Sequence, residues 1–405
     1  MLNEEVIEKV IARLTRRIEQ GNEYILEKMG KSIKKIGTLE PYQAYQLGQL
    51  MKYGGDYEKI VNKIAEITRL NIKDIYKIFE EVAKNDYNFA KQFYDYRNQK
   101  FIPYEENMQL RNQVEALATI TANEYRNLTR TLAFTKIVNG KVVYTPLAIA
   151  YENMLDKAVL SVTQGKTTFQ EEMYHMVKEL AESGIKTVNY GTNRSVRLDS
   201  AVAMQMKGAL RTLHNEMQEQ LGKEFGSDGV EISVHQYPAP DHAEVQGRQF
   251  SNVEFEKFQN DIDAVDYKGK SFPAEFEGHD RRSISQYNCY HYTFAIILGV
   301  NEPEYNDEEL RNIINDNNKG FNFVGKHYTN YEGTQLQRQI ETEVRRQKEV
   351  QIMAKASGET QLVQEAQQKI RLLSEKYKAL SEISGLPTIM ERMRVPNYKK
   401  VAKVK

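Results

Sequence analysis

Hydrophobic side chains recur every three or four positions along most of the chain, with charged residues between them. This is the spacing of amphipathic helices. It predicts helices over 3–38, 41–51, 104–135, 146–162, 168–183, 199–221, 253–262 and 308–315. Residues 334–384 continue the pattern around Gly358, which predicts either one long helix or a helical hairpin that needs a partner surface.

Two further helical patterns, 60–67 and 72–82, are separated at Leu70-Asn71. Two short helices with such a break are compatible with a helix-turn-helix that reads DNA. Short amphipathic helices more often pack into a core, however. We therefore favour packing over DNA binding for this region.

A few short segments break the helical pattern and predict strands. Residues 138–143 contain Asn139-Gly140, which favours a hairpin with a type I′ turn, and 186–198 predicts a second hairpin that turns at 190–193. Asp199 or Ser200 is expected to cap the helix that follows. Residues 230–234 alternate like a buried strand, and 292–298 are apolar enough for a core strand or buried turn.

These patterns predict an α+β fold that is predominantly α-helical. We divide the chain into a helical N-terminal region (1–105), a helical region with two β-hairpins (106–225), a small α+β module (226–333), a long charged helix or helical hairpin (334–385) and a basic flexible tail (386–405).

Composition narrows the class of protein. The 405 residues include 56 Lys plus Arg and 56 Asp plus Glu, so the net charge is zero, which disfavours a protein that mainly grips nucleic acid. One cysteine excludes an intramolecular disulfide and fits assembly in a reducing cytoplasm. The longest apolar run is too short for a bilayer, so we expect no membrane partner. Polyanions remain candidate partners of four tail lysines, Lys399, Lys400, Lys403 and Lys405.

Residue types that ligate metals or titrate gather between Val234 and Val300. This segment holds four of the seven histidines and the only cysteine. Its two ends read VHQYPAPDHAEVQGRQFS and GHDRRSISQYNCYHYTFAIILGV. The candidate site residues in these two motifs are His235, Pro240, His242, Gln246, Gly247, Arg248, His279, Asn288, Cys289 and His291.

Three interpretations of this cluster are open. The first is a zinc site of His235, His242, Cys289 and His291, because thiolate and imidazole both suit zinc and residues 289 and 291 share one face of an extended segment. The second is catalysis by a Cys289 thiolate beside a histidine. The third is a polar core in which the histidines and Gln246 hydrogen-bond to loop backbone.

The polar core is the favoured interpretation. Paired ligand spacings typical of zinc motifs are absent, and no known cysteine-hydrolase signature surrounds Cys289. A single cysteine is also more often a small buried apolar residue than a nucleophile. We therefore expect no catalytic residue and no cofactor, with zinc as the alternative.

The two motifs resemble those of the phage minor capsid protein 2 family, which is related to the Mu F-like head morphogenesis proteins of tailed phages. The family motifs run roughly H-x-G-A-R-P-x-H-A-x-W-Q-G-[KR]-x-[FY]-S, and G-x-N-C-x-H followed by an aromatic stretch and G-[VI]. Matching positions are His235, Pro240, His242, Ala243, Gln246, Gly247, Arg248, Phe250, Ser251, Asn288, Cys289, His291, Phe294, Gly299 and Val300. The chain departs from the motifs at Tyr237-Pro238-Ala239, Val245 and Tyr290, where the family has Gly-Ala-Arg, Trp and Arg.

The resemblance implies a minor capsid (head morphogenesis) protein of a tailed bacteriophage or prophage. Such a protein is a structural virion component near the portal inside the head, assembled in the host bacterial cytoplasm. The implied partners are the portal protein, the major capsid protein, or both, bound through amphipathic helices, with packaged DNA a candidate partner of the basic tail. The alternative is a head-carried enzyme of nuclease or transferase type, or a zinc-binding module, that uses the cluster around Cys289.

Overall fold

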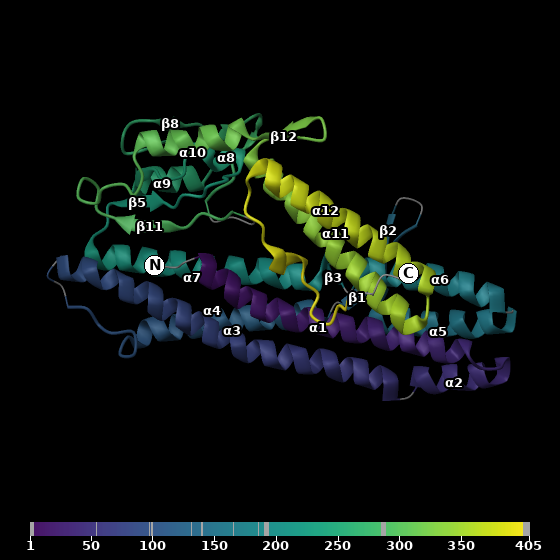
Figure 1. Ribbon diagram of the computed structural model, residues 1–405. Coiled ribbons are helices and arrows are strands. Elements are labelled where there is room, and N and C mark those ends of the chain that lie inside the picture. The colour runs from purple at the N-terminus through teal and green to yellow at the C-terminus, as the bar shows by residue number, and fades with distance from the viewer. Residues whose placement is uncertain are drawn as a thin grey trace.

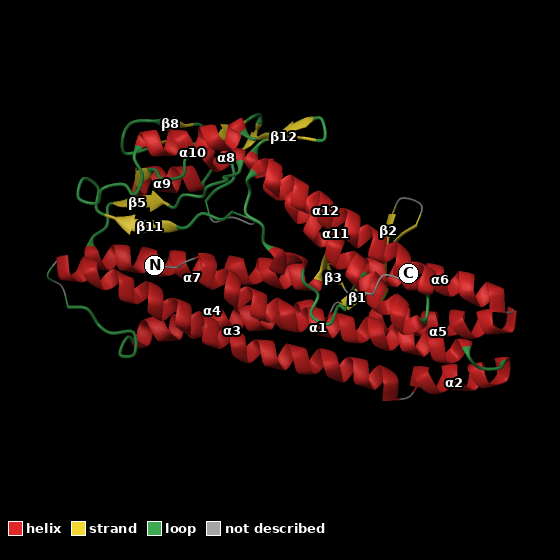
Figure 2. Cartoon of the chain, viewed as in Figure 1, coloured by secondary structure: helices red, strands yellow, loops and turns green. Residues whose placement is uncertain are grey.

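The long predicted helices assemble into an elongated bundle, and a small α+β module lies on one end of it (Figure 1). This computed structural model describes residues 4–53, 55–96, 98, 100–130, 132–138, 141–164, 166–184, 186–189, 194–284 and 289–399. Figure 2 shows that helices build the bundle and that most strands are short. Within the described residues, no helix is long and apolar enough to cross a membrane.

Four helices make up the N-terminal third. They are α1 (Glu4–Gly37), α2 (Pro41–Tyr53), α3 (Gly55–Tyr96) and α4 (Met108–Arg130). The prediction of two short helices separated at Leu70-Asn71 is wrong, and with it the helix-turn-helix alternative, because α3 is one helix of 42 residues. Neither Gly nor Pro interrupts it after its first residue, and its apolar positions line one buried face.

A four-stranded antiparallel sheet forms from two hairpins, with the order β2-β1-β3-β4. Its strands are β1 (Leu132–Val138), β2 (Lys141–Pro146), β3 (Lys186–Asn189) and β4 (Arg194–Arg197). Both predicted hairpins are confirmed, although their turn residues lie outside the described part of the chain. The predicted helix over 104–135 is wrong at its end, since α4 stops at Arg130 and Phe134 is a buried strand residue.

Two helices, α5 (Leu147–Gln164) and α6 (Lys166–Ser183), connect the hairpins, and α7 (Leu198–Phe225) follows the sheet. The predicted helix over 168–183 is confirmed at its end: α6 ends at Ser183, and the next residue, Gly184, has a positive φ of 61°. The predicted cap of α7 is wrong. Its N-cap is Arg197, without a side-chain cap, and the Asp199 carboxylate instead accepts hydrogen bonds from two arginines.

The α+β module folds around an antiparallel sheet with the order β11-β5-β6. Its main elements are β5 (Gly229–Ile232), α8 (Pro240–Ala243), β6 (Gln249–Ser251), α9 (Asn252–Gln259), β11 (Thr293–Ile296) and α10 (Asp307–Lys319). Short hairpins are formed by β7 (Ala264–Val265) with β8 (Ser271–Phe272), β9 (Glu275–Phe276) with β10 (His279–Asp280), and β12 (Phe321–Phe323) with β13 (Lys326–Tyr328). The predicted strand over 230–234 is confirmed in part as β5, and of the two alternatives for 292–298 the core strand is confirmed, as β11. The buried side chain of Ala295 on β11 also belongs to the core of the bundle, so this strand anchors the module.

The C-terminal part is a helical hairpin of α11 (Asn330–Ser357) and α12 (Thr360–Ser384), which turns at Gly358 with a φ of 89°. The segment after it includes the 3₁₀ helix η1 (Met390–Met393). The prediction of a flexible tail is wrong through Lys399. Met393 and Val395 are buried, and the Asn397 N–H donates to Glu23 Oε2 at 2.9 Å.

Three of the four tail lysines, Lys400, Lys403 and Lys405, lie outside the described residues. Lys399 is described: its side chain is exposed, and its carbonyl accepts a hydrogen bond from Lys355 Nζ at 2.6 Å. The boundaries between the five predicted parts of the chain stay a prediction.

Buried and partly buried charged side chains join α1, α7 and α11 where these helices meet. Arg197 donates from both Nη atoms to the Glu349 carboxylate, at 2.9 and 2.6 Å. Arg345 donates to Asp199 Oδ2 at 2.6 Å and to Glu19 Oε1 at 3.3 Å. Burial raises the pKa of Asp199, but the two guanidiniums outweigh burial and hold this pKa below its usual range.

We predict that Arg345→Met lowers the free energy of unfolding by about 3 kcal/mol, because it leaves the buried carboxylate of Asp199 with one guanidinium fewer. The matched control is Arg371→Met. Arg371 pairs with Glu375 on the surface, so its loss should cost less than about 0.5 kcal/mol. Urea unfolding followed by circular dichroism measures both, and equal losses would contradict a structural role for the network.

A second prediction concerns pH. Burial, with smaller contributions from Glu349 and Glu27, raises the pKa of Glu23 from 4.5 to about 7, even though the Asn397 N–H bond lowers it. The folded protein therefore keeps this proton where the unfolded chain has lost it, and stability falls as pH rises from about 5 to about 8. Glu23→Gln should be about 1–2 kcal/mol more stable than the wild type at about pH 8 and similar at about pH 5. Parallel stability–pH curves for the two proteins would refute this.

Candidate functional site

The structure brings the two sequence motifs together through the pairing of β5 with β11. The Ser233 N–H donates to the Tyr292 carbonyl at 2.9 Å, which continues the ladder beyond β5. His291 therefore lies beside the loop that leaves β5, and α8 in that loop supplies His242. His242, Cys289 and His291 meet with exposed fractions of 1%, 2% and 2%.

The cysteine sulfur lies between two imidazole nitrogens. Cys289 Sγ is 3.6 Å from His242 Nδ1 and 3.5 Å from His291 Nδ1, and it also accepts a bond from the His291 N–H at 3.4 Å. Each of the three side chains offers one ligand atom, and these atoms all lie within 4.8 Å of one another. The geometry therefore suits either a metal ion or a hydrogen-bonded polar core.

The far nitrogen of each imidazole is held by an oxygen. His242 Nε2 lies 2.8 Å from the Arg282 carbonyl, which can only accept, so Nε2 carries the hydrogen. His291 Nε2 lies 3.3 Å from Gln246 Oε1. That atom also accepts the His235 N–H at 2.9 Å, which identifies it as the amide oxygen and makes His291 Nε2 a donor too.

His235 lies at the edge of the cluster. Its ring centroid is 4.6 Å from that of His291, and its Nε2 is hydrogen-bonded to the Tyr290 carbonyl. The Gln246 side chain is 1% exposed, and its amide nitrogen has no hydrogen-bond partner among the described residues. Three predicted residues, His235, Gln246 and His291, thus belong to one network.

Burial sets the protonation of the cluster. It lowers the pKa of His291 to about 2, with help from the charges of His235 and His242, so His291 is neutral. Burial also lowers the pKa of His242, but the hydrogen bond to Cys289 and the thiolate charge outweigh it and raise this pKa above its usual range. The two imidazoles therefore differ in their readiness to take a proton.

The other motif residues position the cluster. Pro240 begins α8, and Gly247 has a φ of 69° where a Cβ would come within 2.6 Å of the Leu310 side chain. Arg248 Nη1 donates to Asp307 Oδ1 at 2.8 Å and to Asp266 Oδ2 at 3.4 Å, so it ties the loop to α10. These contacts explain why Pro, Gly and Arg occupy these three positions, and none of the three is needed to bind a ligand.

The structure does not describe the side chains of two predicted site residues. His279 lies in β10, and the structure does not describe its side chain. Asn288 lies outside the described residues. Their predicted place in the motif stays a prediction.

Sequence reasoning missed two arginines that support the site. Arg282 forms a two-pronged ion pair with Asp241, at 2.5 and 2.7 Å, and so holds the loop that carries His242. Arg281 is 5% exposed and donates to the carbonyls of Phe258 and Phe272 at 2.9 and 3.1 Å. In the sequence the two arginines form a charged pair in a polar loop, a pattern that gives no sign of burial.

Arg281 should stabilise the module, because its guanidinium also lies 3.6 Å from the centroid of the Phe258 ring. We predict that Arg281→Met, which keeps the apolar stem but leaves buried carbonyls unbonded, costs about 2–4 kcal/mol. Arg311→Met on the exposed face of α10 is the control and should change stability by less than about 0.5 kcal/mol. Urea unfolding measures both variants, and a neutral Arg281→Met would contradict the assignment.

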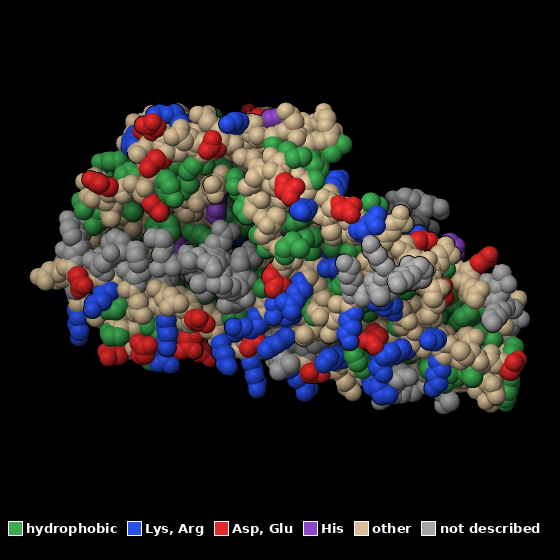
Figure 3. Space-filling view, in the orientation of Figure 1, with side chains coloured by type: hydrophobic (Ala, Val, Ile, Leu, Met, Phe, Trp, Pro, Cys, Tyr) green, Lys and Arg blue, Asp and Glu red, His purple; other side chains and the backbone are tan. Residues whose placement is uncertain are grey.

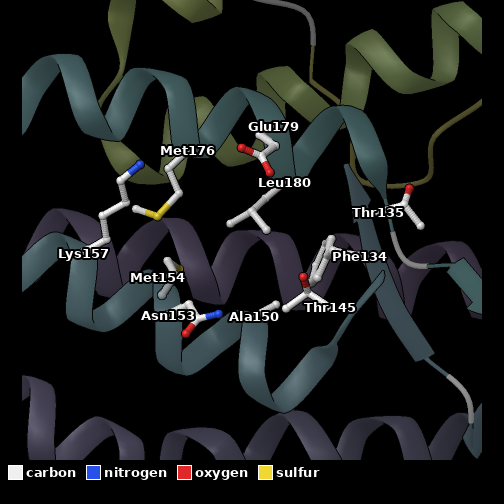
Figure 4. A pocket seen from close by; sticks show the side chains of 10 residues that line it. All are labelled: Phe134, Thr135, Thr145, Ala150, Asn153, Met154, Lys157, Met176, Glu179 and Leu180. Atoms are coloured by element: carbon white, nitrogen blue, oxygen red, sulfur yellow. The ribbon is translucent and has the colours of Figure 1, made fainter. Parts of the chain in front are cut away.

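A separate pocket lies between α5, α6 and the β1–β2 hairpin (Figure 4). Apolar side chains such as Phe134, Met154 and Met176 line it, and Lys157 and Glu179 are its charged members. Lys157 Nζ is already paired with Glu172 at 2.6 Å. None of the predicted site residues is part of this pocket.

Comparison with known proteins identifies the class. A protein-family model described as "Phage minor capsid protein 2" matches residues 2–381, nearly the whole chain. The chain therefore belongs to the phage minor capsid protein 2 family. It is a structural protein of a bacteriophage virion, which confirms the resemblance seen in the two motifs. Neither a curated protein nor a solved structure matches it.

Proposed function

We propose that this minor capsid protein lies inside the phage head next to the portal. We also propose that it is incorporated into the head in the host bacterial cytoplasm. The observation that carries the proposal is the family match over residues 2–381, in a fold built mainly of long helices. A protein of this shape has extended side surfaces suited to contacts with large partners.

The most suitable surface for the portal or the major capsid protein is the outer face of α12. This helix packs mainly on α11 and lies at the edge of the bundle (Figure 1). Leu372 and Ile383 are more than half exposed. They are eleven residues apart, which places them on the same side of the helix. We propose that a helix or groove of the partner covers this side of α12.

Packaged DNA is the partner we propose for a basic surface. Figure 3 shows Lys and Arg side chains along the lower side of one face, over α1 and α3. On α1 the exposed basic residues include Lys31, Lys34 and Lys35. Lys34 approaches Gly358 at the end of α11, and Lys355, one turn earlier, hydrogen-bonds to Lys399. The described part of the tail, which ends at Lys399, thus lies next to the basic end of α1, although the whole chain is neutral.

An enzymatic role has less support. A substrate would have to reach Cys289, whose side chain is buried with both neighbouring histidines. Burial of this kind suits a structural site better than a hydrolytic one. We therefore do not propose catalysis.

The location can be tested with a photoreactive amino acid placed at Leu372 in an infected cell. We expect crosslinks to the portal or major capsid protein in procapsids and virions. The control position is Tyr42, an exposed residue of α2, which lies on the opposite side of the bundle from α12 in Figure 1. Mass spectrometry of the purified particles identifies the products. Absence of the protein from both kinds of particle, or equal crosslinking from the two positions, would reject the proposal.

A further inference from the structure

We propose that His242, Cys289 and His291 form a buried zinc site that joins the two motifs of the α+β module. The site is independent of where the protein lies in the virion. The zinc ion would be a ligand that the family match does not assign.

The distances fit a tetrahedral ion. Zinc binds thiolate sulfur at about 2.3 Å and imidazole nitrogen at about 2.0–2.1 Å, so a tetrahedral angle separates the two ligand atoms by about 3.6 Å. In this structure Cys289 Sγ lies 3.6 Å from His242 Nδ1 and 3.5 Å from His291 Nδ1. Both sulfur–nitrogen distances therefore have the length that one shared ion requires.

The imidazoles also point the correct atoms at the sulfur. Because His242 Nε2 and His291 Nε2 both donate hydrogen bonds, each neutral ring has its lone pair on Nδ1, which faces Cys289. Histidines that ligate metals usually donate the opposite N–H to a carbonyl or similar oxygen. The Arg282 carbonyl and the Gln246 amide oxygen supply these two acceptors.

A cation accounts for this arrangement better than a thiol does. One S–H proton can be directed at only one of the two Nδ1 atoms at a time, whereas a divalent ion binds the sulfur and both nitrogens together. Transfer of that proton to His242 would leave the thiolate facing the Nδ1 lone pair of His291, because His291 Nε2 is the nitrogen that donates to Gln246. Zinc is the ion of choice because one thiolate and two imidazoles are its ordinary ligands.

Three protein ligands leave one coordination position. We assign it to a water molecule, because the group of ligand atoms within 4.8 Å of one another contains His242, Cys289 and His291 but not His235. The cluster is enclosed, since all three ligand side chains are at most 2% exposed. An enclosed ion of this kind has a structural role, because it links α8 to the segment just before β11. Its ligands His242 and Cys289 are 47 residues apart in the sequence.

Metal content of the full-length protein tests the site. The protein is produced without a polyhistidine tag in zinc-supplemented medium, dialysed, and measured by inductively coupled plasma mass spectrometry. We expect roughly one zinc per chain. The zinc content per chain should fall more than about tenfold in each of three variants, Cys289→Ala, His242→Ala and His291→Ala. His327→Ala, which removes an exposed histidine from the β12–β13 hairpin, should keep it. Equal zinc in the wild type and Cys289→Ala would overturn the proposal.

Cobalt gives a readout that does not depend on the variants folding. Titration of chelator-treated wild-type protein with Co²⁺ should produce a thiolate-to-cobalt absorption band that saturates near one equivalent, as expected for one cysteine ligand. Addition of zinc should abolish the band. Absence of the band in folded wild-type protein would equally overturn the proposal. Because the isolated protein is measured, failure here leaves the proposed location in the phage head untouched.

Discussion

The ion pairs of Arg197 and Arg345 with the buried carboxylates of Glu349 and Asp199, where α1, α7 and α11 meet, are the constraint on which the bundle depends. Apolar helix faces tolerate small shifts along one another, but a two-pronged bond from Arg197 to Glu349 has a single good geometry. Such a pair contributes little net energy and instead selects one register of the helices. The same pairing fixes the start of α7, which in turn supports β11 and the whole α+β module.

The α+β module also depends on the pairing of two of its own strands. Antiparallel pairing of β5 with β11 places His291 next to the loop that carries His242. The side-chain oxygen of Gln246 then accepts hydrogen bonds from the His235 N–H, just after β5, and from His291 Nε2, just before β11. The motif residues therefore act together: some shape the loop, and others present nitrogen and sulfur atoms to one enclosed point. This organisation explains how a structural protein can carry a cluster of residues that look catalytic.

Periodicity in the sequence predicted most helices, both hairpins and the predominantly helical α+β class, because these features depend on local spacing. It failed where tertiary contacts decide. The sequence around Leu70 suggested a break that α3 does not have, and Asp199 looked like a cap until its two arginine partners were known. The cluster of reactive residue types was visible in the sequence. Its geometry was not, since His242 and Cys289 meet only through a strand pairing, and buried Arg281 looks like a surface residue.

The contact between α1 and α11 has a consequence for how the chain is made. Glu19 and Arg345 are 326 residues apart, yet they bond in the centre of the bundle. At 5–20 residues per second, the ribosome needs roughly 15–65 seconds to produce α11 after α1 has emerged. During that interval the apolar face of α1 lacks one of its final neighbours. Synthesis rate and chaperone supply in the infected cell therefore bear directly on the yield of folded protein, because aggregation competes with completion of the bundle.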